Sequence, residues 1–65
     1  MADANLDSVR QEFAALTGLF EDAALVASAG QGVKNLDDGR RRFNRISIAM
    51  QRIHRHLIIL EGRLQ

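Results

Sequence analysis

The chain has 65 residues, of which 46% are hydrophobic and 26% are charged, and its formal net charge at pH 7 is +1. Disordered chains show the opposite composition, with low hydrophobicity and high net charge. Cys is absent and His occurs only twice, which excludes disulfides and thiolate metal sites and argues against structural zinc. One small domain over 1–65 is marginally stable alone, so we expect association to stabilise it and expect no cofactor.

The N-terminal segment does not resemble a targeting signal. Residues 1–5 contain neither the basic start nor the apolar run of a signal peptide. No uninterrupted apolar stretch reaches the roughly 18 residues of a membrane-spanning helix. The sequence therefore predicts a cytoplasmic protein without a membrane span.

Apolar residues over about 5–29 recur at alternating spacings of three and four, which predicts one helix. Asn5 stands just before the first of them, where its side chain can cap the helix, and Gly30 suits a left-handed residue that ends it. The series consists of Leu6, Val9, Phe13, Leu16, Phe20, Ala23 and Ala27.

Residues 30–34 form a short Gly-containing loop, the length that joins antiparallel neighbouring helices. A second helix is predicted over about 35–63, with Asn35 as its cap and Asp37 and Asp38 at the positive end of its dipole. Its apolar series is Leu36, Phe43, Ile46, Met50, Ile53, Leu57, Leu60 and Leu64. The predicted fold is therefore all-α, a two-helix antiparallel hairpin.

The two helices resemble one another in sequence. Residues 5–13 align with residues 35–43, with Asn, Leu, Asp, Arg and Phe matching in place. Either a helix was duplicated, or two similar helices adopted the same capping chemistry. Both interpretations predict two equivalent helices that begin near residues 5 and 35.

The chain carries more apolar surface than one helix–helix contact line can bury. Further large side chains lie beside the two series, at Leu19, Leu25, Val26, Ile48, Ile58 and Ile59. Because such a patch on a small protein indicates an interface, we expect two hairpins to form a homodimeric four-helix bundle. A tetramer and either orientation of the hairpins remain open. The predicted interface and core residues are Leu6, Val9, Phe13, Leu16, Leu19, Phe20, Phe43, Ile46, Met50, Ile53, Leu57 and Leu60.

Charge is divided between the halves, with −4 over residues 1–29 and +5 over residues 30–65. Four Arg of the second helix share one outer face at helical spacing, where they can border a protein interface or follow phosphates. No aromatic residue accompanies them to stack a base, and an anionic membrane surface is a further alternative. The predicted partner face is Ile48, Ile58, Ile59, Arg41, Arg45, Arg52 and Arg55.

His54 and His56 are two residues apart, so a helix directs them to opposite flanks of its apolar series and one ion cannot easily bind both. The sequence also contains no recognisable catalytic set of a nucleophile, a general base and an acid that orients the base. We therefore predict no catalysis. The predicted function is a helical interaction module that acts as a regulator or adaptor through an unknown protein partner, and the alternative is a bundle that binds RNA or DNA.

Overall fold

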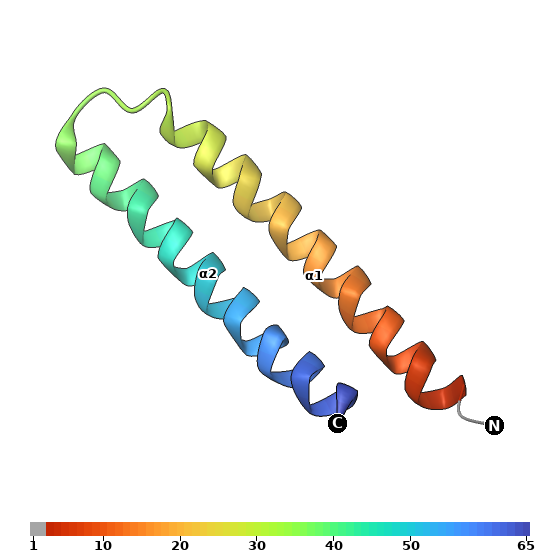
Figure 1. Cartoon of the computed structure of the whole chain (residues 1–65). Coiled ribbons are helices and arrows are strands. Elements are labelled where there is room, and N and C mark those ends of the chain that lie inside the picture. Colours follow the sequence, from red (N-terminus) through yellow and green to blue (C-terminus); the bar gives the residue numbers. More distant parts are fainter. Residues whose placement is uncertain (1–2) are drawn as a thin grey trace.

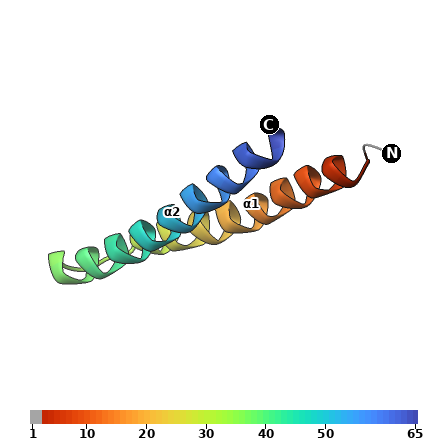
Figure 2. The same ribbon diagram turned by 90° about the horizontal axis from the view of Figure 1, so that it is seen from below.

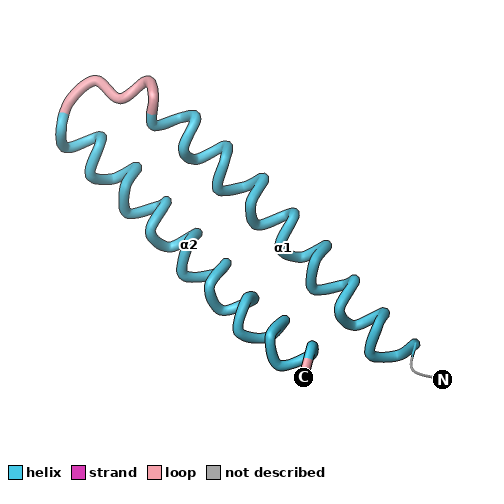
Figure 3. Tube along the Cα trace, viewed as in Figure 1, coloured by secondary structure: helices cyan, strands magenta, loops and turns pink. Residues whose placement is uncertain are grey.

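The computed structural model describes residues 3–65, and the side chains of residues 5–65. Helix α1 (Asp3–Gly30) and helix α2 (Leu36–Leu64) run antiparallel, so the start of α1 and the end of α2 both lie at the end opposite the loop (Figure 1). Residues 31–35 form the only connection between them (Figure 3), and residues 3–65 contain no strand. The predicted all-α antiparallel hairpin is confirmed.

Backbone hydrogen bonds of the tighter i to i−3 type end α1. The amides of Gln31, Gly32 and Val33 donate to the carbonyl oxygens of Ser28, Ala29 and Gly30 at 3.1, 3.2 and 3.3 Å. These bonds satisfy carbonyls that the last helical turn leaves without a partner. No glycine among the described residues has a positive φ, so the left-handed role predicted for Gly30 is wrong.

The start of α2 follows the capping chemistry expected from the sequence. Asn35 has extended backbone angles, and its Oδ1 accepts a hydrogen bond of 2.8 Å from the amide of Asp38. Asn5 has no such role because α1 already begins at Asp3, so the cap predicted at Asn5 is wrong. The two helices therefore match in sequence but not in how they begin.

The helices pack through two stripes of side chains on each helix. The central stripe is buried or half-buried throughout and consists of Val9, Leu16, Ala23 and Gly30 in α1 and Gly39, Ile46, Ile53 and Leu60 in α2. The inner stripe lies three residues further along and is half-buried except for Arg63; it consists of Glu12, Leu19 and Val26 in α1 and Arg42, Ala49, His56 and Arg63 in α2. Both stripes repeat every seven residues, as in coiled-coil packing.

A third stripe, three residues before the central one, is exposed at every position. We call it the open stripe; it consists of Leu6, Phe13, Phe20 and Ala27 in α1 and Leu36, Phe43, Met50, Leu57 and Leu64 in α2. Because the helices are antiparallel, the same offset from the central stripe puts both halves of the open stripe on one side of the hairpin. The hairpin thus has one apolar face that stays exposed over the part of the chain that the structure describes.

The core that remains is small. Among the described side chains only Leu16, Ile53 and Leu60 are buried, with partly buried neighbours around them. The Cα atoms occupy a slab of 55 × 15 × 9 Å, one layer of helices thick. Figure 2 shows the two helices inclined to one another, as expected when side chains of facing helices interdigitate.

Helix α1 is long and apolar enough over Asn5–Gly30 to cross a membrane, judged by length and composition alone. Its best window has a mean hydropathy of 1.3, and a core helix of a soluble bundle passes the same test. Glu21 and Asp22 fall in the middle of the apolar segment, where carboxylates are costly in lipid. The absence of a membrane span stays a prediction from the sequence.

Candidate functional site

The open stripe is an exposed apolar surface that runs along both helices of the hairpin. Phe13, Phe20 and Phe43 are 53%, 51% and 68% exposed, although such side chains are normally buried. The stripe forms successive cross-helix layers, because α1 residues lie level with α2 residues in reverse order. The layers, from the chain ends to the loop, are Leu6 with Leu64, Phe13 with Leu57, Phe20 with Met50, and Ala27 with Phe43.

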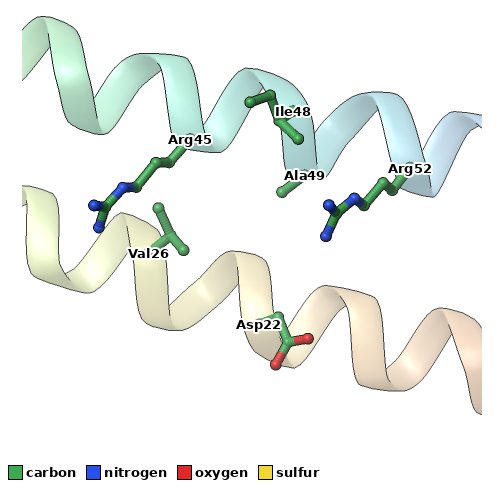
Figure 4. Close-up of a pocket in the computed structure, with 6 residues that line it drawn as sticks. All are labelled: Asp22, Val26, Arg45, Ile48, Ala49 and Arg52. Carbon is green, nitrogen blue, oxygen red and sulfur yellow. The ribbon is translucent and has the colours of Figure 1, made fainter.

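The opposite side of the hairpin carries a shallow groove of ≈ 230 Å³. Arg45 and Arg52 extend from α2 toward α1 on either side of Ala49 (Figure 4). Val26 and Ile48 add apolar lining, and Asp22 of α1 supplies an acidic edge. Asp22, Arg45 and Arg52 each precede a central-stripe residue by one position, so this side too is built from equivalent positions of both helices. The groove combines two guanidinium groups with an aliphatic surface.

Polar contacts join the helices beneath this groove side. His56 Nδ1 lies 2.8 Å from Glu12 Oε2, and the Glu12 side chain is only 12% exposed. Nearer the chain ends, Arg63 donates to the hydroxyl of Ser8. These two contacts show the register of α1 along α2. They also explain why the inner stripe contains charged residues, which its position between two helices does not suggest.

The basic residues of α2 divide into two groups. Arg40, Arg41 and Arg42 lie near the start of the helix and pair with Asp37 or Asp38 at 2.9 to 3.7 Å. Arg45, Arg52 and Arg55 are exposed and form no ion pair with any described side chain. The second group is therefore the one that is free to meet an anionic partner.

The structure separates the predicted interface and core residues into two sets. Five lie in the central stripe and Leu19 lies in the inner stripe, so these six meet within the hairpin: Val9, Leu16, Leu19, Ile46, Ile53 and Leu60. The other six lie in the open stripe and keep roughly half or more of their surface exposed: Leu6, Phe13, Phe20, Phe43, Met50 and Leu57. Val26, expected beside the interface, instead faces α2 from the inner stripe.

The predicted partner face lies away from the open stripe. Ile48 and Ile58 are 50% and 56% exposed, and Ile59 is half-buried next to the inner stripe. Leu25 of α1, 70% exposed, is likewise outside the open stripe. Glu12 and Arg63 could not be predicted as helix-joining residues, because their partners lie 44 and 55 residues away in the sequence.

His54 and His56 fall on different sides of α2, as their spacing predicts: His54 is exposed, whereas His56 contacts Glu12. Among the described side chains, no group of three or more His, Cys, Asp or Glu lies close enough to hold a metal ion. The arrangement offers hydrophobic contact on one side and guanidinium recognition on the other.

No protein-family model, curated protein or solved structure matches this chain.

Proposed function

We propose that this chain is a non-enzymatic interaction module that forms a homodimeric four-helix bundle through its open stripe. The observation that carries the proposal is the exposure of all nine open-stripe residues on one side of the hairpin. An apolar face of this extent on a small protein indicates a protein interface. A second hairpin is the simplest element of matching length and shape to cover it.

The surface area supports association of this kind. A compact chain of 7.2 kDa exposes about 4,100 Å² according to the usual scaling with mass, whereas this hairpin exposes 5282 Å². If the dimer were as compact as a monomeric protein of twice the mass, the two hairpins together would lose about 3,700 Å² on pairing. Such an area lies within the range of obligate homodimers, about 2,000–5,000 Å².

The layers of the open stripe favour a second copy over an unrelated helix. Each of the four layers pairs side chains from both helices, and all of their members are apolar. A twofold axis brings such a surface against itself without leaving a charged group buried. A single amphipathic helix from another protein would cover only part of a stripe that runs along both helices.

The groove side then remains open for a protein partner of the dimer. Arg45 and Arg52 with Ile48 provide an aliphatic contact bordered by guanidinium groups, which suits a partner segment that carries carboxylates beside apolar side chains. In this proposal the protein acts as a regulator or adaptor. The partner face predicted from sequence includes these three residues.

The second candidate is a bundle that binds RNA or DNA. The exposed guanidinium groups of Arg45, Arg52 and Arg55, which pair with no described carboxylate, favour it. Asp22 at the groove edge disfavours phosphate at that point. Phosphate binding also weakens steeply with salt, by about 10³–10⁵ between 50 and 200 mM for six to ten contacts, whereas apolar docking does not.

Size-exclusion chromatography with light scattering, read at low and high salt, tests the proposal. The chain has no Trp, Tyr or Cys, so strong absorbance at 260 nm under the peak reports a bound nucleic acid. We expect a mass of twice the chain mass at both salt concentrations and no such absorbance. A folded monomer would refute the bundle, and a dimer that loses 260 nm absorbance at high salt would establish the second candidate.

A further inference from the structure

Residues that border the open stripe can distinguish the two ways in which the hairpins can pair. Four positions after each open-stripe residue lies an edge position, on the rim of the apolar face. The edge positions are Arg10, Thr17 and Ala24 in α1 and Arg40, Ser47, His54 and Glu61 in α2; all are exposed except Ser47, which is half-buried. Apart from Ala24, they are the first polar side chains that a second hairpin would meet.

The register of the hairpin fixes the height of each edge position. The contacts of Glu12 with His56 and of Ser8 with Arg63 show that α1 and α2 residues lie level when their numbers add up to about 70. Arg10 is therefore level with Glu61 along the hairpin axis. By the same rule Thr17 is level with His54, and Ala24 with Ser47.

A twofold axis can relate the hairpins in two ways. An axis parallel to the helices puts the two loops at the same end and lays α1 over α2 of the partner subunit. Arg10 then faces Glu61 of the partner subunit. In the same way, Thr17 faces His54 of the partner subunit and Ala24 faces Ser47 of the partner subunit. An axis perpendicular to the helices puts the loops at opposite ends, with α1 over α1. With the four layers aligned, Arg10 then faces Ala24 and each His54 faces its own copy.

The charges of the helices favour the first arrangement. Over Asp3–Gly30 the formal charge is −4, and over Leu36–Leu64 it is +4. With the loops together, every neighbouring pair of helices has opposite charge and the like-charged helices lie on the diagonals. With the loops apart, like-charged helices are neighbours, at a separation of about 8–10 Å that physiological salt screens only in part.

We propose that the open stripe takes a second copy of this chain with both loops at the same end, and that Arg10 pairs with Glu61 of the partner subunit at two symmetric places. This inference rests on the proposed homodimer and adds its orientation and its specificity-determining ion pair. Complementary edge charges of this kind select orientation more than they add affinity.

A charge-swap experiment tests the pair. Arg10→Glu and Glu61→Arg should each weaken the dimer about tenfold, since each change converts two attractions into two repulsions. The double variant Arg10→Glu/Glu61→Arg should restore the dissociation constant to within about threefold of the original value. If both single variants dimerise as the original chain does, or the double variant shows no recovery, the pair is refuted.

Arg40→Glu is the matched control. Arg40 is also an edge arginine, and like Arg10 it pairs with an Asp three residues earlier in its own helix. The nitrogen–oxygen distance is 2.9 Å between Arg40 and Asp37, and 3.6 Å between Arg10 and Asp7. It is level with the loop rather than with a charged edge position. Reversing its charge should leave the dissociation constant of the dimer within about threefold of the value for the original chain. A loss as large as that of Arg10→Glu would show that overall charge, not the pair, matters.

Spin-label distances test the orientation independently. Because the chain has no Cys, Gln31→Cys places a single label in each loop. Loops at the same end predict a label separation within about 20 Å, whereas loops at opposite ends predict about 40 Å, the length of a 28-residue helix. Light scattering on the same sample separates the two failures: a monomer refutes the homodimer, and a dimer with the long distance refutes only the orientation.

Discussion

Truncation of one open-stripe phenylalanine measures how much that face contributes to association. Phe20 lies in the middle of the stripe and keeps 51% of its surface exposed in the hairpin. A Phe side chain buries about 200 Å² when fully covered, so about 100 Å² is left for a second subunit to cover. At about 25 cal/mol per Å², and allowing for the carbon that Ala retains, Phe20→Ala should cost about 2 kcal/mol per copy.

The proposed dimer would contain two copies of this site, so the free energy of dissociation should fall by about 4 kcal/mol, roughly a thousandfold in the dissociation constant. Sedimentation equilibrium at several concentrations measures it directly. Leu25→Ala is the control, because Leu25 is on the same helix and 70% exposed but lies outside the open stripe. We expect it to leave the dissociation constant unchanged. Equal effects of the two substitutions, or none from Phe20→Ala, would contradict the assignment of the open stripe as the interface.

Three further predictions concern stability, each measured by thermal or urea unfolding at a fixed protein concentration because an associating chain unfolds in a concentration-dependent way. Asn35→Ala removes the observed cap of α2 and should cost about 1 kcal/mol, whereas Asn5→Ala inside α1 should cost little; equal losses would contradict the cap assignment. His56→Ala leaves the Glu12 carboxylate nearly buried without its partner and should cost about 1–3 kcal/mol, against less than about 0.5 kcal/mol for exposed His54→Ala. Gly18→Ala adds a Cβ that meets nothing within 4 Å in the middle of α1, so it should stabilise by up to about 1 kcal/mol; a lower Tm would show that another surface packs there.

The 30-residue sequence repeat has a structural counterpart. Leu6 and Leu36 are both exposed in the open stripe, and Leu16 and Ile46 both lie in the central stripe. The repeat therefore relates positions with equivalent surroundings, which either a duplication or a common packing requirement produces. Asn5 and Asn35 break the equivalence, because Asn35 caps α2 whereas Asn5 lies inside α1.

The sequence alone determined the two helices, their antiparallel connection and the width of their apolar surface. Hydrophobic spacing is a local property, and a spacing of three and four residues requires a helix whatever the helix packs against. The cap at Asn35 was predictable for the same reason, since a cap involves residues three apart along one segment. The apolar series of both helices correctly contained Leu16, Ile53 and Leu60, the buried core.

Only the tertiary structure decided which flank of each helix faces the other. The central stripe has apolar residues on one flank, such as Phe13, and a mixture on the other, such as Glu12 and Leu19. Apolar spacing favours the first flank, yet the hairpin packs through the second, where Glu12 of α1 contacts His56 of α2. That contact joins residues 44 positions apart, and no local pattern encodes it. The apolar flank is left exposed as a result, and this flank is the one that we propose as the interface.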